Sequence, residues 1–252
     1  MPPRVVAIIQ ARMASSRLPG KVLADLGGRP VLAWVVRRAS RAVGIHQVVV
    51  ATSVAAKDDV IAAFCKEQGF ACSRGNLHDV LDRYVQAARE FDAEVVVRLT
   101  GDCPLIDPEM LADNLRAFLE AQPPLDFAAN RLPGDRTIPI GLDAEFCTMA
   151  ALEIAWRETQ EPHQREHVMP FFYEHPERFR ILHIKHSPSY GHYRWTLDTP
   201  EDLELLRQVV RHFKDDEFSW KDVLALFERK PELAQINAAV QHKSQHDVDS
   251  RQ

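Results

Sequence analysis

Short apolar runs alternate with segments of helical periodicity along the first half of the chain, and this alternation constrains the fold more than any other feature. Val48 to Thr52 and Val95 to Leu99 are rich in β-branched residues and almost free of polar positions. Strands of that kind are typical of a parallel sheet that is covered on both faces. The sequence therefore predicts an α/β fold with a doubly wound, mostly parallel, Rossmann-like sheet.

The pattern also predicts where the regular elements lie. The expected strands are Val5 to Ile9, Val48 to Thr52, Val95 to Leu99 and Tyr193 to Leu197. The expected helices are Val31 to Ala42, Val60 to Glu67, Val80 to Phe91, Met110 to Ala121, Glu201 to Phe213 and Trp220 to Glu228. Thr199 is the expected cap of the helix that Pro200 opens. We expect one domain over 1–231, with a proline-interrupted insertion at about 122–193, and a polar, partly disordered tail over 232–252.

Composition limits the possible functions. The 252 residues carry a formal net charge of -5, so no overall basic field favours nucleic acid as a partner. No apolar run approaches the ~20 residues of a membrane helix, and no leader pattern precedes the first strand. We therefore expect a soluble, cytoplasmic protein without a membrane partner. Four cysteines lie scattered without metal-ligand spacing, and we expect them to be free thiols.

A basic loop follows the first expected strand. Arg12, Arg17 and Lys21 lie within it, together with Gly20. Because ligands of doubly wound sheets bind beyond the carboxyl ends of the strands, these cations are placed to meet phosphate oxygens. Neither the Walker loop nor the three-glycine Rossmann fingerprint is present. The alternative is a solvated basic loop after an ordinary strand.

The residues from Gln10 to Lys21 read Gln-Ala-Arg-x-x-Ser-x-Arg-Leu-Pro-Gly-Lys. This motif resembles the opening of the cytidylyltransferase family that activates acidic sugars, especially its spore-coat-polysaccharide-protein-F-like branch. Ala14-Ser15 departs from the Gly-Ser that is common there. The resemblance extends from Val5 to about Phe213 and implies a nucleotide-diphospho-sugar transferase-like fold. It also implies nucleotide contacts from Gln10, Ala11, Arg12, Ser16, Arg17 and Lys21.

Two aspartates stand at expected strand ends. Asp102 belongs to a Gly-Asp-x-Pro turn, and Asp198 precedes Thr-Pro at a helix start. Each has a structural explanation, an Asx turn for Asp102 and favourable interaction with the helix dipole for Asp198. Two acids at neighbouring strand ends can also share a magnesium ion. In the resembled family the corresponding aspartates hold the catalytic magnesium, and we assign Asp102 and Asp198 as metal ligands on that basis.

The segment from Ser73 to Tyr84 resembles the part of the family that shapes the nucleotide-base pocket. It implies nucleotide contacts from Asn76, Asp79 and Arg83. Asp79 could equally cap a helix, and Arg83 could equally form a surface pair, which would contribute little to stability. Both interpretations stay open at this point.

The acceptor side of the resembled family corresponds to the Gly141-Leu-Asp-Ala-Glu145 and Arg165-Glu-His-Val168 stretches. The resemblance implies substrate contacts from Asp143, Arg165, Glu166, His167 and Arg194. A capped helix start is the alternative for Arg165 and its neighbours. His163-Gln-Arg-Glu-His167 also fits a zinc-protease motif. Pro162 opens that segment, however, and no third ligand is evident.

These features predict a magnesium-dependent nucleotidyltransferase that moves CMP from CTP to an acidic sugar or related acceptor and releases pyrophosphate. Arg12 and Lys21 would neutralise the triphosphate, and Asp102 and Asp198 would fix the metal. The resemblance also implies a homodimer. The alternatives are a nucleotide-sugar glycosyltransferase, a zinc peptidase and a non-catalytic nucleotide-binding protein.

Overall fold

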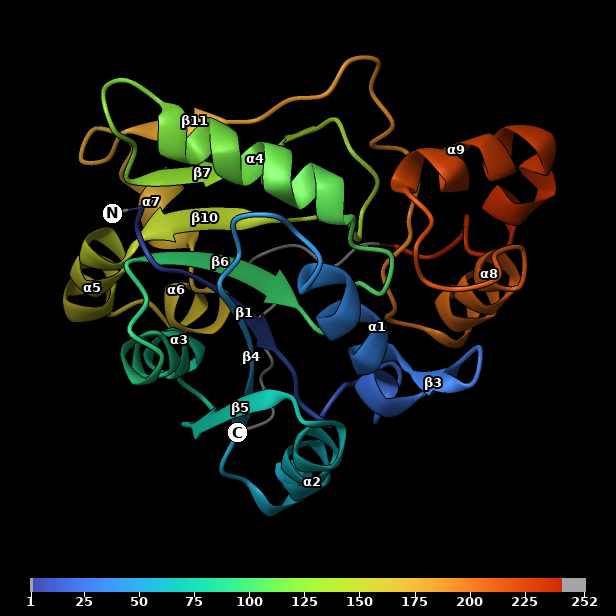
Figure 1. The fold of residues 1–252 in the computed structure, drawn as a ribbon, viewed down its shortest axis with the longest axis horizontal. Helices are drawn as coiled ribbons and strands as arrows, with labels where there is room; N and C mark the ends of the chain where they lie inside the picture. The colour runs from blue at the N-terminus through green and yellow to red at the C-terminus, as the bar shows by residue number, and fades with distance from the viewer. Residues whose placement is uncertain (1, 242–252) are drawn as a thin grey trace.

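The computed structural model describes residues 2–241 and is organised around one central sheet (Figure 1). Within the described residues this sheet has seven strands in the order β11-β7-β10-β6-β1-β4-β5. In chain order they are β1 (Val5–Gln10), β4 (Gln47–Ser53), β5 (Ala71–Gly75), β6 (Val95–Thr100), β7 (Phe127–Ala129), β10 (Glu145–Thr148) and β11 (Ile181–His183). Two short ribbons lie outside it, β2 (Asp25–Leu26) with β3 (Arg29–Pro30) and β8 (Arg131–Leu132) with β9 (Asp135–Arg136).

Helices cover both faces of this sheet (Figure 1). The α-helices are α1 (Val31–Ala39), α2 (Asp59–Gln68), α3 (Val80–Glu90), α4 (Pro108–Glu120), α5 (Met149–Glu158), α6 (Pro162–His167), α7 (Pro170–Glu174), α8 (Pro200–Val210) and α9 (Trp220–Arg229). The 3-10 helices are η1 (Lys21–Leu23), η2 (Ala56–Asp58) and η3 (Pro231–Gln235). No α-helix in the described part of the chain is both long and apolar enough to cross a membrane.

The central strand β1 shows why the sequence forms this sheet. It pairs in parallel with β4 on one side and β6 on the other. Its alternate residues Val5, Ala7 and Ile9 pack into one buried cluster with α1, α2 and α4. Val6 and Ile8 pack on the opposite face with α3, α5 and α7. A strand buried on both faces must be apolar throughout, as this one is.

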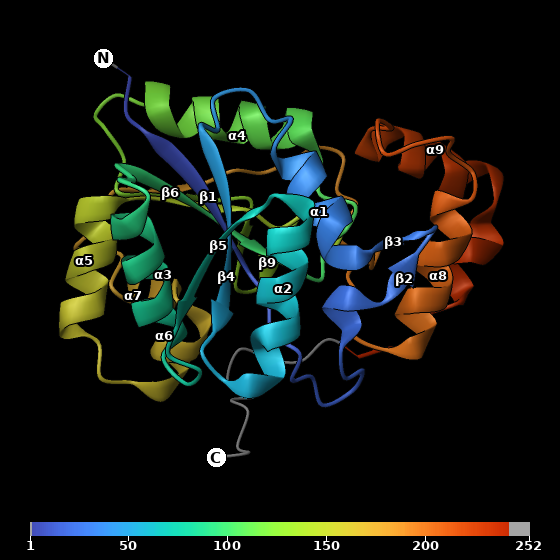
Figure 2. The same ribbon diagram turned by 60° about the horizontal axis from the view of Figure 1, so that its bottom comes forward.

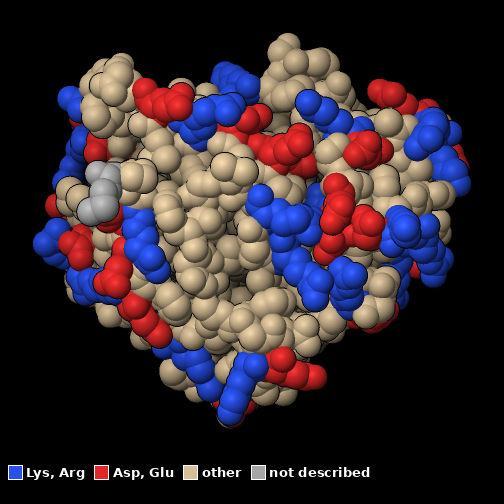
Figure 3. Space-filling model, viewed as in Figure 1, with Lys and Arg blue, Asp and Glu red and all other residues tan. Residues whose placement is uncertain are grey.

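A third hydrophobic cluster lies at one end of the sheet. It gathers α8 and α9 with residues of β2, α1 and the segment around Trp195, and we call this part the C-terminal lobe (residues 193–240). Figure 2 shows α8 and α9 beside α1 and the β2–β3 ribbon, apart from α3 and α5. On the face seen in Figure 3, acidic and basic side chains are interspersed.

The structure confirms the α/β fold and all the helices expected from the pattern. Thr199 caps α8 in a reciprocal capping box with Asp202, and Pro200 occupies its first turn. The expected strand from Tyr193 to Leu197 is wrong. It forms only an isolated bridge between Ile140 and Arg194, because its backbone changes partner from Ile140 to Asp102 within a few residues.

Two further differences concern the extent of the sheet. The parallel strand β5 was not expected, because its sequence Ala-Cys-Ser-Arg-Gly carries no β-branched or aromatic residue. The proline-interrupted region 122–193 supplies β7, β10 and β11, so it adds three short strands to the central sheet. The first part of the expected tail is regular, since η3 covers Pro231–Gln235. Residues 242–252 of that tail lie outside the described residues.

One buried arginine joins the C-terminal lobe to the sheet. Arg38 of α1 is fully buried, and its guanidinium donates to the carbonyl oxygens of Ile106 at 2.7 Å, Asp216 at 2.5 Å and Phe218 at 2.9 Å. Burial lowers the pKa of Arg38 to about 10, with opposing contributions from Asp107 and Asp216. Arg38 therefore satisfies buried acceptors on two segments that are far apart in the sequence.

We predict that Arg38→Met destabilises the protein by at least about 3 kcal/mol, because it leaves several buried carbonyl groups without a donor. Urea unfolding followed by circular dichroism measures this loss. Arg37→Met, at the exposed neighbouring position, is the matched control and should change stability little. Equal effects of the two substitutions would contradict the linking role of Arg38.

Candidate active site

A cleft of roughly 320 Å³ opens at the carboxyl ends of β1 and β6, within the size range of small-molecule sites. The loop after β1 forms one wall, and the turn after β6 forms its base. The segment at Asp143 and Glu145, the end of α6 and the segment before α8 complete it. The predicted residues that line it are Gln10, Ala11, Arg12, Ser16, Arg17, Lys21, Arg83, Asp102, Asp143, Glu166, His167 and Asp198.

Local backbone geometry fixes the two loops against each other. The N–H of Gly101 donates to the carbonyl of Gln10 at 2.9 Å. A Cβ at Gly101 would lie 3.0 Å from that oxygen, so this close approach requires glycine. In the basic loop, Gly20 has a φ of 73° and its N–H donates to Met13. This left-handed turn leads the chain directly into Lys21.

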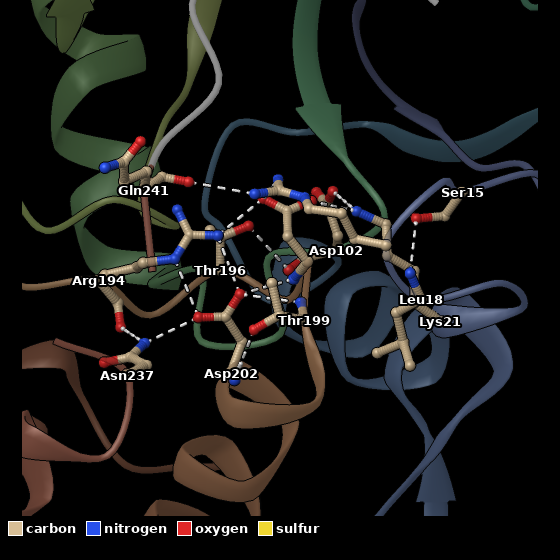
Figure 4. Close-up of polar contacts among 12 residues, drawn as sticks. Ser15, Leu18, Lys21, Asp102, Arg194, Thr196, Thr199, Asp202, Asn237 and Gln241 are labelled. Atoms are coloured by element: carbon tan, nitrogen blue, oxygen red, sulfur yellow. Dashed lines mark hydrogen bonds and ion pairs between the residues drawn. The ribbon is translucent and has the colours of Figure 1, made fainter. Parts of the chain in front are cut away.

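Lys21 lies between the two predicted metal ligands, Asp102 and Asp198, and Figure 4 shows Lys21 and Asp102 within this cluster of polar contacts. Its Nζ is 2.5 Å from Asp102 Oδ2 and 2.7 Å from Asp198 Oδ1. Burial lowers the pKa of Lys21, but Asp102 and Asp198 outweigh burial, so the net pKa is raised. The lysine side chain is 12% exposed, which keeps this ion pair partly shielded from water and makes it stronger than a surface pair.

Asp198 receives further positive charge on its second oxygen. Oδ2 lies 2.8 Å from the guanidinium of Arg17 and 2.8 Å from that of Arg194. Burial raises the pKa of Asp198, whereas Lys21, Arg194 and Arg17 lower it, and the net pKa lies well below its usual range. Asp198 is therefore ionised at neutral pH. Arg17 also donates to the carbonyl of Gln241 at 3.1 Å, so the C-terminal segment reaches the cleft.

The arrangement fits a magnesium ion that shares its ligands with a nucleotide. Asp102 and Asp198 already hold one cation, the ammonium group of Lys21, between their carboxylates. In residues 2–241 no group of three His, Cys, Asp or Glu side chains could hold a metal. Magnesium commonly uses one or two carboxylates and completes its shell with phosphate and water. These residues suit that mode, and Lys21 would then be available to the phosphates.

A second set of polar side chains lines the same cleft, and we call the part that they form the inner part: Arg98, Arg131, Glu145, His167 and Tyr173. Arg98 on β6 forms an ion pair with Glu145 on β10, its direct cross-strand neighbour. Its Nε has no hydrogen-bond partner, and neither has the buried Nε2 of His167. Burial, Arg98 and Arg131 lower the pKa of His167 to about 4, so this imidazole is neutral at pH 7. Unpartnered buried polar atoms at a cleft are available to a ligand.

Of the residues in the inner part, the sequence predicted only His167 as a contact. Arg98, Arg131, Glu145 and Tyr173 all line the cleft. One local signal was present for Arg98, because it interrupts an otherwise apolar parallel strand, Val-Val-Val-Arg-Leu. A charge inside a strand that is buried on both faces needs a partner or a function. Glu145 offered no comparable signal until the register placed it opposite Arg98.

Four predicted residues do not line the cleft: Asn76, Asp79, Arg165 and Arg194. Arg194 is buried and contacts Asp198. The side-chain oxygen of Asn76 accepts hydrogen bonds from the backbone N–H groups of His78 and Asp79. Asp79 caps α3 through Asp82 N at 2.8 Å and pairs with Arg165 at 3.2 Å. Arg165 also donates to the carbonyls of Trp156 and Thr159, so it joins α6 to the end of α5. The structure thus gives Asn76, Asp79 and Arg165 local structural contacts.

Arg83 and Asp143 do line the cleft. They differ in how many of their polar atoms already have hydrogen-bond partners. Arg83 is buried, donates to the carbonyl of Asn76 at 3.0 Å and keeps an unpartnered Nε. Asp143 is held by both terminal nitrogens of Arg136, at 2.5 and 3.1 Å. Glu166 lies 3.5 Å from Arg12. The structure therefore brings Arg83, Asp143 and Glu166 to one cavity, where their predicted contacts with nucleotide and acceptor remain predictions.

The zinc-protease motif does not form a metal centre in the described residues. His163 Nε2 lies 2.9 Å from Glu174, and Glu166 lies beside Arg12. The surroundings of Cys103, which also lines the cleft, do not favour a nucleophilic thiolate. Burial raises the pKa of its thiol far above neutral pH, and Thr100 Oγ1 lies 3.1 Å from its sulfur.

A model of the cytidylyltransferase family matches residues 6–243. The chain belongs to the cytidylyltransferase family. The spore coat polysaccharide biosynthesis protein SpsF of Bacillus subtilis is 32% identical over 238 residues, which are 91% of this chain and 96% of that protein. This similarity confirms the predicted family and branch, and the protein is a nucleotidyltransferase.

Two solved structures are similar to this chain. A cytidylyltransferase from Leptospira borgpetersenii is 34% identical with a TM-score of 0.89, covering 95% of this chain and 100% of that one. A CMP:2-keto-3-deoxy-manno-octonic acid synthetase complexed with CTP is 22% identical with a TM-score of 0.62, covering 83% and 99%. At this lower identity the second likeness shows the fold alone. The fold class expected from the sequence is therefore confirmed.

We predict that the stability of this cytidylyltransferase falls as pH drops from about 6.5, the ordinary pKa of histidine, to about 4, the pKa of His167 in the fold. In that range the unfolded chain binds a proton that the folded site does not, so His167 contributes a slope of up to about 1.4 kcal/mol per pH unit. His167→Gln should remove this contribution, measured by urea unfolding across the range. His212→Gln, at an exposed position, is the control and should leave the slope of unfolding free energy against pH unchanged. The same slope in the wild type, His167→Gln and His212→Gln would contradict the prediction.

Proposed function

We propose that the protein transfers CMP from CTP to a hydroxyl group of an acidic sugar or related acceptor and releases pyrophosphate, with magnesium as the metal. The single observation that carries this proposal is the placement of Lys21 between Asp102 and Asp198, beside Arg17. Two carboxylates that can share a metal stand next to cations that can bind phosphates. A triphosphate–metal complex needs both kinds of group within one cleft.

The chain's own residues have distinct tasks in this reaction. Arg12, Arg17 and Lys21 bind the triphosphate oxygens through charge-assisted hydrogen bonds. Asp102 and Asp198 hold magnesium, which when bound would polarise the phosphate that is attacked. The hydrogen bond from Gly101 N to Gln10 O joins the turn that carries Asp102 to the start of the loop after β1. It therefore fixes the position of Asp102 relative to the residues that would bind the nucleotide. Catalysis then depends on positioning and electrostatics rather than on a covalent intermediate.

The inner part of the cleft favours an anionic acceptor. Arg98 and Arg131 both line it, and His167 there is neutral. Glu145 pairs with Arg98, which fixes the guanidinium in orientation and leaves its Nε available. A carboxylate would meet this fixed guanidinium, and hydroxyl groups could bond to the histidine. The acid named for the synthetase of the same fold has these groups. The homodimer and the cytoplasmic location expected from the sequence remain predictions.

The test is pyrophosphate release with magnesium and each of the four nucleoside triphosphates, against a panel of sugar acids, sugar phosphates and phosphonates. Release is expected with CTP and an anionic acceptor. Asp102→Asn and Asp198→Asn should each lower turnover by roughly 100-fold or more, because each removes charge at the metal. Both proteins should keep the wild-type circular dichroism spectrum.

Other outcomes of this assay would contradict the proposal. Release of nucleoside diphosphate from a nucleotide sugar would indicate glycosyl transfer instead. Normal turnover in Asp198→Asn would remove the metal assignment. CTP binding without any product across the panel would favour a non-catalytic binding protein.

We further predict that Arg98→Lys weakens acceptor binding. Lysine keeps the charge beside Glu145 but lacks the planar fork that binds a carboxylate. The KM for the productive acceptor should rise roughly 10- to 100-fold, as expected for the loss of a hydrogen bond to a charged group. The dissociation constant for CTP, measured by calorimetry, should stay unchanged. An equal loss of CTP affinity would place Arg98 at the nucleotide instead.

A further inference from the structure

Two buried residues, Arg194 and Asp202, hold the side chain and the backbone of Asp198, and Figure 4 shows both residues next to Asn237. Arg194 donates to Asp198 Oδ2 at 2.8 Å and to both oxygens of Asp202 at 2.9 Å. Asp202 Oδ2 in turn accepts the backbone N–H of Asp198 at 2.9 Å. Arg194 and Asp202 thus form a closed cycle with Asp198, and we call the pair Arg194–Asp202 the brace.

Asn237 donates hydrogen bonds to both members of the brace. It lies beyond η3, in the C-terminal lobe, and is 5% exposed. Its Nδ2 donates to Asp202 Oδ1 at 2.8 Å and to the backbone carbonyl of Arg194 at 3.0 Å. One amide group therefore contacts both members of the brace, from a segment that is more than thirty residues away from either in the sequence.

The brace acts on one oxygen of Asp198 only. Arg194 holds Oδ2, whereas Oδ1 faces Lys21 at 2.7 Å. When Lys21 binds phosphate instead, Oδ1 becomes available while Oδ2 stays held by Arg194. Asp202 is fully buried. Because the desolvation cost of a buried ion pair can cancel its Coulombic gain, added stability does not account for the brace, whereas a role in orienting Asp198 does.

We propose that Asn237 is a positioning residue of the active site, which orients Asp198 toward the metal through Arg194 and Asp202. This inference rests on the proposed function, because it assumes that Asp198 binds a metal with the nucleotide. It assigns to the C-terminal segment a role in the reaction that no sequence motif indicates. Partners behind a metal ligand typically set metal affinity by 10- to 100-fold.

The experiment measures binding of Mn²⁺ to the full-length protein by electron paramagnetic resonance of the free ion, with and without CTP. Wild-type protein should bind Mn²⁺ with CTP present. Asn237→Ala should raise the dissociation constant for Mn²⁺ about 10-fold, while the melting temperature shows that the protein is folded. Gln235→Ala is the matched control, since Gln235 is an exposed residue of the same segment and should leave Mn²⁺ binding unchanged.

Arg194→Lys provides a second variant, which keeps the charge but lacks the planar fork that contacts both oxygens of Asp202 and Asp198 Oδ2 together. It should also weaken Mn²⁺ binding, and excess Mn²⁺ should restore turnover in both variants. A purely structural defect would not respond to the metal concentration in this way.

The failures of the inference and of the proposed function can be told apart. Unchanged Mn²⁺ affinity in folded Asn237→Ala and Arg194→Lys, together with weakened affinity in Asp198→Asn, would overturn the positioning role alone. Unchanged Mn²⁺ affinity in Asp198→Asn, or no Mn²⁺ binding by the wild type with CTP, would overturn the metal assignment and the inference with it.

Discussion

The site depends on one cation held between two carboxylates. Lys21, Asp102 and Asp198 come from the loop after β1, the turn after β6 and the segment before α8, and only the fold brings them together. Because the pair is largely shielded from water, the charges compensate one another more strongly than on the surface. The charged groups of the cleft are thus paired with one another. In the proposed reaction, Lys21 would exchange its carboxylate partners for phosphate, and Asp102 and Asp198 would hold the metal instead.

The two ends of the cleft differ in how their charges are supported. Arg12 and Arg17 extend from a loop, so they can adapt to a flexible triphosphate. Arg98 and Glu145 lie on neighbouring strands of the central sheet, where their backbone positions are fixed. Rigid elements hold a recognition group more accurately than loops do. The geometry therefore suits a nucleotide bound by adaptable charge and an acceptor selected by a fixed charge.

The sequence predicted those parts of the site that follow directly from the ends of strands. The loop at Arg12 to Lys21, the turn at Asp102 and the helix start at Asp198 are local patterns, and the rule for ligand position in parallel sheets places them together. The Arg98–Glu145 pair could not be predicted in this way, because it depends on the antiparallel register of β10 against β6. Arg165 shows the same limit, since its contacts with Asp79 and the end of α5 depend on how helices pack. The strand expected at Tyr193 to Leu197 failed because alternating apolar residues there pack into the C-terminal lobe instead of pairing.

The proposed metal ligands come from two parts of the molecule, which gives the links between the C-terminal lobe and the sheet a role. Asp102 lies in the turn after β6 and Asp198 in the lobe, so any movement between them would change the distance that a shared ion requires. Leu197 N donates directly to Asp102 O at 2.8 Å, which ties the two ligands together at the cleft. Outside the cleft, Asp107 caps α4 with one carboxylate oxygen. Its other oxygen accepts a hydrogen bond from the backbone N–H of Trp220 at 2.7 Å. Buried polar links of this kind fix orientation in a way that apolar packing alone does not, because hydrogen bonds are directional. The lobe therefore serves the site by keeping Asp198 in register with the sheet.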